Sequence, residues 1–231
     1  MNKILYAFAL AGVLGLSSCS DFLDQNSPSE MTAENTYASP YYTNLRVNKL
    51  YGGMAQDRTY AQDLSIVWNL NSDCELIDGL GSNATNTSSE RGNMNYNMDP
   101  GWSKISGVWD AEYGIIEDAN QIIEGIRSSA TLTAGGANQK SMERSLGEAL
   151  TIRAMVYFDL VRIFGDIPFK VEASKSDLSN AYLEKTDRDV IMDFLMNDLD
   201  EAIEYLPWAD QATGYTTERT TKGYAHALLA Q

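Results

Sequence analysis

The stretch GEALTIRAMVYFDLVRIFGDIPF, residues 147–169, limits the fold more than any other part of the sequence. Its apolar residues recur at three- and four-residue steps, which is the period of an α-helix. The apolar arc of this helix covers roughly 240°, so most of its surface must be buried. We expect the helix to run from near Ser141 to Phe164, because Gly165 ends it and Pro168 prevents its resumption.

Arg153 lies at the centre of this apolar arc, where a leucine would be expected. A buried guanidinium group without a partner is strongly destabilising. Either Arg153 holds a carboxylate or backbone carbonyls of a neighbouring element, or it faces a ligand. Its rigid fork of N–H donors suits the first task, so we expect a structural role. The side of the helix outside the apolar arc carries Glu148, Thr151, Met155, Asp159 and Arg162.

The rest of the chain also has the pattern of helices joined by loops. Helical periodicity covers residues 101–129 and 186–207, and Thr186 with Asp189 fits a capping box at the start of the latter. A further helix is expected after Ser39 and another from residue 220, inside which the chain stops, so we interpret the chain as a fragment. Since no segment shows convincing strand alternation, the sequence predicts an all-α fold.

The N-terminus, MNKILYAFALAGVLGLSSC, has the pattern of a bacterial lipoprotein signal. Its apolar run from Ile4 to Leu16 is shorter than the roughly 20 residues that span a bilayer. We therefore expect a signal peptide at 1–18, lipid attachment at Cys19, a polar tether at 19–38 and a helical domain at 39–231. The alternative is an ordinary cleavage site followed by an incidental cysteine.

Composition and motifs argue against several classes of protein. A net charge of −15 disfavours nucleic acid and anionic membrane surfaces as partners. The sequence has no Gly-rich phosphate loop, HExxH or GxSxG motif, and its single histidine, His226, lies in a predicted helix. Cys74 is expected to be buried, with a reactive thiol as the alternative. The acidic group Asp73, Glu75 and Asp78 does not fit an EF-hand, so we expect a solvated turn there, with a calcium site as the alternative. We predict no metal, no cofactor and no enzyme activity.

Several stretches together resemble the N-terminal half of SusD/RagB-family outer-membrane lipoproteins. They are CSDFLDQNSP, WDAEYGIIEDANQIIEGI, the 147–169 block, TDRDVIMDFLMNDLDEAIEYLP and TTKGYAHALLAQ, with local departures at Phe158 and Ile167. The resemblance implies an all-α fold of tetratricopeptide-like helix pairs with long irregular ligand-binding loops, here truncated. It also implies a structural role for Arg153, since matching arginines belong to the scaffold of the family.

The resemblance further implies a function at the exterior of the outer membrane. Family members bind glycans or other nutrients and deliver them to a SusC-type TonB-dependent transporter. Two alternatives remain. One is a scaffold lipoprotein that binds protein or peptide through helix grooves. The other, less favoured, is a surface glycosidase, which the sequence leaves open because the separation of its two carboxylates is a spatial property.

The irregular segment between Trp68 and Trp102 is where we expect ligand contacts. Aromatic rings cover the apolar faces of sugars, and short amides bond to their hydroxyl groups. The candidates are Tyr96, Trp68, Trp102, Asn71, Asn93 and Asn95. Trp68 and Trp102 have an alternative role as core anchors at the ends of the segment, so Tyr96 is the ring expected to be exposed.

Overall fold

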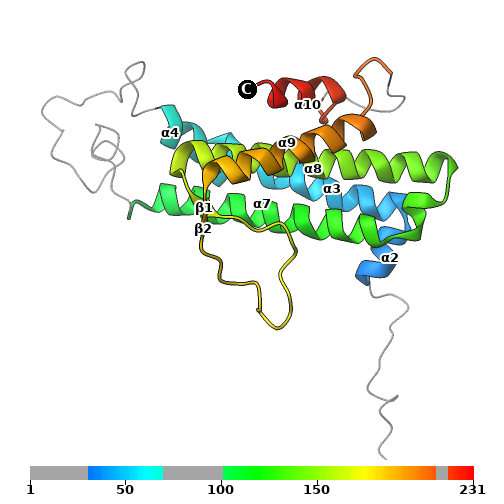
Figure 1. Ribbon diagram of the computed structural model, residues 1–231, viewed down its shortest axis with the longest axis horizontal. Coiled ribbons are helices and arrows are strands. Elements are labelled where there is room, and N and C mark those ends of the chain that lie inside the picture. The colour runs from blue at the N-terminus through cyan, green and yellow to red at the C-terminus, as the bar shows by residue number, and fades with distance from the viewer. Residues whose placement is uncertain (1–30, 70–100, 212–217) are drawn as a thin grey trace, which may run out of the picture. The chain divides into compact units, whose positions relative to one another are not determined.

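A computed structural model describes residues 31–69, 101–211 and 218–231, and Figure 1 shows their arrangement. As expected from the sequence, the described part of the chain is mainly helical. Its α-helices are α2 (Ala33–Ala38), α3 (Pro40–Met54), α4 (Asp63–Asn69), α7 (Ser103–Ser128), α8 (Gly136–Phe164), α9 (Arg188–Tyr205) and α10 (Lys222–Leu229). A π-helical turn, η2 (Asp57–Ala61), a 3₁₀ turn, η3 (Ala130–Thr133), and two short strands, β1 (Ile167–Pro168) and β2 (Lys185–Thr186), complete the described elements.

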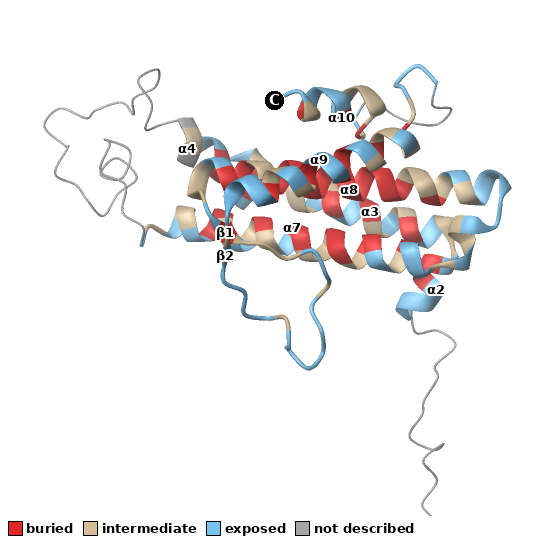
Figure 2. Ribbon diagram, viewed as in Figure 1, coloured by how far each residue is buried: buried red, intermediate tan, exposed pale blue. Residues whose placement is uncertain are grey.

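Helix α8 is the central element of the bundle. It packs against α7, α9 and α3, and α10 packs against α9. Helices α7 and α8 form a pair joined by η3, and α9 returns along α8 (Figure 1). Buried residues concentrate along α8 (Figure 2), where Leu146, Leu150, Tyr157 and Leu160 are at most 1% exposed. The burial that the 147–169 pattern demanded is therefore supplied by helices on several sides.

Most of the side of α8 outside the apolar arc is also buried, which the sequence pattern did not predict, and Arg162 near the end of the helix is exposed. Glu148, Thr151 and Asp159 are at most 5% exposed. The hydroxyl of Tyr51 in α3 donates to Glu148 Oε2 at 2.7 Å, and that of Tyr60 in η2 donates to Asp159 Oδ2 at 2.8 Å. Burial of Glu148 and Asp159 is tolerated because neighbouring elements provide them with hydrogen-bond donors.

Both ends of α8 are set by glycine. The helix begins at Gly136, earlier than the expected start near Ser141, and the backbone N–H of Gly135 donates to Gln139 Oε1 at 2.9 Å. At the other end, Gly165 has a φ of 75°, a conformation that favours glycine. The expected stop at Gly165 is correct, whereas the polar first turns of the helix carried too little apolar periodicity to be recognised.

The chain enters α9 through the strand pair. β1 and β2 are antiparallel, with Ile167 opposite Thr186, and strands this short show no alternation in sequence. The N-cap of α9 is Asp187, whose Oδ1 accepts from the backbone N–H of Asp189 at 2.8 Å. The capping box expected at Thr186 is therefore wrong, because Thr186 belongs to β2 and the next residue, Asp187, caps the helix with its carboxylate.

The packed unit of the chain starts at Ala33. Tyr37 in α2 is 6% exposed and belongs to the main hydrophobic core. Its ring lies so close to α7 that a Cβ atom on Gly125 would come within 2.2 Å of it. Residues 33–38 are therefore part of the helical unit, and the expected boundary between tether and helical domain at residue 38 lies too late in the chain.

Candidate functional site

The segment between β1 and β2, residues 169–184, leaves the bundle as an exposed loop, yellow in Figure 1 and largely pale blue in Figure 2. The strand pair holds its two ends together. Within the loop, Asn180 Nδ2 donates to the carbonyl of Ala173 at 2.8 Å, and Asn180 Oδ1 accepts from the N–H of Lys175 at 3.0 Å. The loop thus has internal hydrogen bonds despite its exposure.

A hollow of about 270 Å³ lies between this loop and α7. Its lining residues are Trp109, Tyr113, Pro168, Lys170, Ala181, Tyr182 and Leu183. Small-molecule sites usually enclose about 300–1,000 Å³, so this volume suits one part of a ligand better than a whole large one. The lining combines aromatic rings, small apolar groups and one ammonium group.

Two rings of the hollow are fixed and one is free. The ring centroids of Trp109 and Tyr113 are 4.9 Å apart, and Phe164 packs edge-on against Trp109 at 4.9 Å. The hydroxyl of Tyr113 donates to the carbonyl of Pro168 at 2.6 Å. Tyr182, on the loop, is 95% exposed. The site therefore has a supported pair of rings on α7 and a ring on the loop that is available to a ligand.

The loop backbone is fixed where it passes the hollow. The hydroxyl of Tyr157 accepts from the N–H of Lys170 and donates to its carbonyl, each at 2.8 Å. Asn120 Nδ2 donates to the same carbonyl at 2.9 Å and to the carbonyl of Glu172 at 3.3 Å. These bonds come from α8 and α7, so the bundle itself positions Lys170 in the wall of the hollow.

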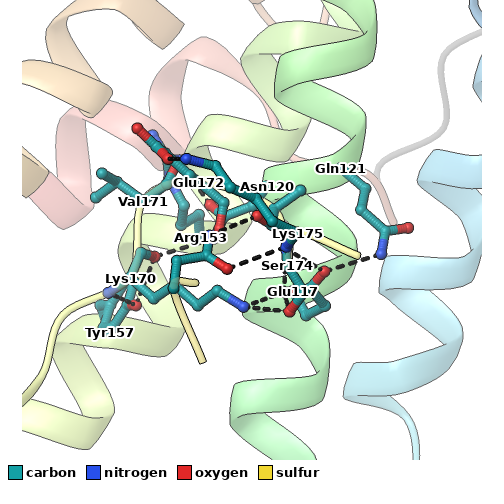
Figure 3. Close-up of polar contacts among 12 residues, drawn as sticks. Glu117, Asn120, Gln121, Arg153, Tyr157, Lys170, Val171, Glu172, Ser174 and Lys175 are labelled. Atoms are coloured by element: carbon teal, nitrogen blue, oxygen red, sulfur yellow. Dashed lines mark hydrogen bonds and ion pairs between the residues drawn. The ribbon is translucent and has the colours of Figure 1, made fainter. Parts of the chain in front are cut away.

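Arg153 of α8 holds the start of the same loop (Figure 3). Its Nε and Nη2 each donate to Asp198 of α9 at 2.8 Å, and its Nη1 donates to Asn120 Oδ1 at 2.8 Å. Nη1 also donates to the carbonyl of Val171 at 3.3 Å. Burial raises the pKa of Asp198, and the charge of Arg153 opposes that rise. Arg153 thus has the neighbouring carboxylate and carbonyl partners that its position in the sequence required.

Glu117 of α7 is the second polar junction between the bundle and the loop (Figure 3). Its carboxylate accepts from Lys170 Nζ at 2.8 Å, from the backbone N–H and the hydroxyl of Ser174 at 2.9 Å each, and from Gln121 Nε2 at 2.9 Å. Burial alone would raise the pKa of Glu117, but these donors lower it to about 2. Glu117 is therefore charged and pairs with the ammonium group that lines the hollow.

The sequence-predicted site residues are only partly within the described chain. Trp68 and Trp102 lie against a small hydrophobic cluster centred on Leu64 and Val108, and the guanidinium of Arg162 lies 4.3 Å from the centroid of the Trp68 ring. This is the anchoring arrangement named as the alternative role for the two tryptophans. Cys19, Asn71, Cys74, Asn93, Asn95 and Tyr96 lie outside the described residues, as do Asp73, Glu75 and Asp78.

Sequence reasoning did not identify the rings of the hollow. The helical pattern assigns Trp109 to the apolar face of α7, and Tyr113 lies one turn later on the same side. Tyr182 follows the turn-rich stretch SKSDLSNA, and such a stretch is a signal of a loop. That signal gives no partner for Tyr182, because the return of the loop to α7 is a tertiary feature.

The described residues were also searched for metal-binding clusters and membrane-spanning helices. Over residues 31–69, 101–211 and 218–231, no three His, Cys, Asp or Glu side chains gather as a metal site would require. No helix in these same ranges has the length and apolarity needed to cross a bilayer. The described candidate site is thus a ring-lined hollow without a metal cluster.

We compared the chain with protein families, curated proteins and solved structures. A family model described as "Starch-binding associating with outer membrane", SusD-like, matches residues 21–231. SusD-like protein P2 of Formosa agariphila is 28% identical over the whole of this chain. The crystal structure of a SusD homolog from Bacteroides thetaiotaomicron matches 85% of the chain with a TM-score of 0.75 and 24% identity. A laminarin-binding SusD-like protein matches 82% of it with a TM-score of 0.63 and 23% identity.

The chain belongs to the SusD-like family. It spans 42% of the length of the Formosa agariphila relative, 36% of the Bacteroides thetaiotaomicron structure and 38% of the laminarin-binding protein. The family and the all-α fold that the sequence indicated are both confirmed.

Proposed function

We propose that this protein binds glycans at the cell surface and delivers them to a SusC-type TonB-dependent transporter of the outer membrane. The observation that carries this proposal is the hollow with its supported pair of rings, Trp109 and Tyr113. The family description as starch-binding and the laminarin-binding relative agree with it. Catalysis is not part of the proposal.

The chemistry of the hollow suits a pyranose ring. Sugars present flat C–H faces, which aromatic side chains cover at low cost in conformational entropy. The rings of Trp109 and Tyr113 are held by Phe164 and by the hydrogen bond to Pro168, so they need little reorganisation on binding. Tyr182, nearly fully exposed, can cover the sugar from the loop side.

The segment from Asn71 to Trp102 supplies the remaining contacts in this proposal. Tyr96 provides a ring there, and Asn71, Asn93 and Asn95 provide amides that both donate and accept hydrogen bonds. Trp68 and Trp102 then anchor the ends of the segment by packing on the small cluster.

The N-terminal sequence completes the proposal with a location. Removal of residues 1–18 would leave Cys19 as the first residue, where acyl chains anchor the protein to the outer membrane. A polar tether then separates the anchor from the helical unit that starts at Ala33. The helical unit faces the exterior, where it caps the transporter.

Affinity gel electrophoresis of the chain in starch and in laminarin tests the proposal. The wild type should be retarded relative to a gel without polysaccharide. Trp109→Ala should reduce the retardation if the hollow binds sugar, and Tyr96→Ala should reduce it if the 71–102 segment does. Tyr41→Ala is the matched control, because Tyr41 is a 67% exposed ring that does not line the hollow.

The melting temperature of each variant separates lost binding from lost folding. Equal mobility of the wild type in all gels would contradict glycan binding. Retardation that survives in both Trp109→Ala and Tyr96→Ala would place the site elsewhere on the protein.

A further inference from the structure

The ammonium group of Lys170 is the one charge among the described residues that line the hollow. An unpaired ammonium group there would attract acidic sugars, such as uronates or sulfated residues, through charge-assisted hydrogen bonds. Lys170 is not unpaired: its Nζ lies 2.8 Å from Glu117 Oε2 and also bonds to the hydroxyl of Ser174. The side chains of Lys170 and Glu117 are only 18% and 25% exposed.

The pairing is held from more than one side. Gln121 on α7 and the backbone N–H of Ser174 both donate to Glu117 at 2.9 Å, so its carboxylate cannot swing away without breaking several bonds. The backbone of Lys170 is held in turn by Tyr157 and Asn120. Both partners are therefore fixed before a ligand arrives, and the charge of Lys170 is already neutralised.

We propose that Glu117 makes the hollow selective for uncharged sugars by holding the ammonium group of Lys170. A neutral sugar stacks on the rings and leaves the ion pair intact. An acidic sugar must compete with Glu117 for Lys170 and then share the site with a second anion. This competition is local, since the remaining surface charges are screened beyond about 8 Å at physiological ionic strength. The inference deepens the proposed function and rests on glycan binding in the hollow.

If Glu117 makes the hollow selective, the substitution Glu117→Gln should change which sugars bind. Glutamine keeps a carbonyl oxygen for the N–H of Ser174 but loses the negative charge, so Lys170 becomes available to a ligand. The affinity for acidic sugar should then rise roughly 5-fold at low ionic strength, the scale of a partly exposed ion pair, while that for neutral sugar stays within about twofold. Added salt should reduce the gain.

The experiment compares one glucan in its neutral and its carboxymethylated form, by titration calorimetry of the full chain. Starch and laminarin are the two glucans, each in both forms. The variants are Glu117→Gln, Lys170→Met, and the two combined, in which the gain for the acidic form should disappear. Lys170→Met alone removes the ammonium group, so it should not raise the affinity for the acidic form. Glu201→Gln is the control for net charge, because Glu201 pairs with Arg127 and does not line the hollow.

Each other outcome has a defined meaning. If the wild type binds neutral and acidic forms equally well, selectivity by Glu117 is refuted while glycan binding stands. If it binds neither form of either glucan, the proposed function fails and this inference fails with it. If Glu117→Gln loses both forms, Glu117 positions the loop and does not select by charge, which also refutes the inference.

Discussion

Glu112 gives the sharpest test of the buried electrostatics of this protein. It lies on α7, is fully buried, and neither of its carboxyl oxygens has a hydrogen-bond partner among the described residues. Burial, reinforced by the nearby charge of Asp159, raises its pKa from 4.5 to about 8. We expect Glu112 to be a neutral carboxylic acid in the folded protein at neutral pH.

The raised pKa makes the free energy of unfolding depend on pH. The folded state binds the proton of Glu112 more tightly than the unfolded state does, so the contribution to stability is complete below pH 4.5 and is lost as pH rises towards 8. At pH 7 the loss amounts to about 3 kcal/mol, from 1.36 kcal/mol per pH unit above the ordinary pKa. Glu112→Gln has nearly the same shape and does not titrate, so it should not show this loss.

The assay is urea unfolding of the wild type and of Glu112→Gln in steps from pH 5 to pH 8. The two proteins should have similar free energies of unfolding at pH 5. At pH 7 the free energy of unfolding of the variant should exceed that of the wild type by about 3 kcal/mol. Asp159 also has a raised pKa, so the difference between the two curves is the diagnostic quantity. The lowered pKa of Glu117 has the opposite sign and affects stability only as pH falls below its ordinary value.

A matched control is Glu148→Gln. Glu148 is equally buried, but its Oε2 accepts from Tyr51 at 2.7 Å and pairs with Arg219 at 2.7 Å. Neutralising it should destabilise the protein at pH 7, because it leaves the Arg219 charge poorly paired. If Glu112→Gln follows the same pH curve as the wild type, or is the less stable of the two at pH 8, the reasoning on Glu112 is refuted.

Two further predictions concern the scaffold and the anchor. Arg153→Met should lower the free energy of unfolding by about 2–4 kcal/mol, since it leaves the buried Asp198 carboxylate and Asn120 without their donor. Thermal and urea unfolding measure this, and an unchanged stability together with lost glycan binding would assign Arg153 to the ligand site. Cys19→Ala should abolish labelling by a tagged fatty acid in cells, because the lipid attachment site is removed. Equal labelling of the wild type and Cys19→Ala would contradict lipidation at this cysteine.

The sequence by itself determined the helical fold and its central helix. The 147–169 pattern required burial on most sides, and its glycine and proline fixed where the helix ends, because local period and backbone preference act over a few residues. It also determined that Arg153 needs a partner, since a buried charge cannot remain unpaired in any fold.

Tertiary structure alone decided which partners the polar residues have. Asp198 lies 45 residues from Arg153 along the chain, and nothing in either local pattern connects them. The sequence pattern puts Glu148 and Asp159 outside the apolar face of α8. In the structure they are buried, and tyrosine hydroxyls of α3 and η2 donate to them. Hydrogen-bond partners are set by how helices pack, and packing depends on the whole set of faces rather than on one helix.

The candidate site, too, could not be predicted from local sequence patterns. Trp109 and Tyr113 have the sequence pattern of core residues of an amphipathic helix, and Tyr182 that of an exposed loop residue. They line one hollow because β1 pairs with β2 and because Tyr157 and Asn120 hold the loop beside α7. A binding site formed by the return of a loop depends on contacts between residues far apart in the chain, and these contacts exist only in the folded protein.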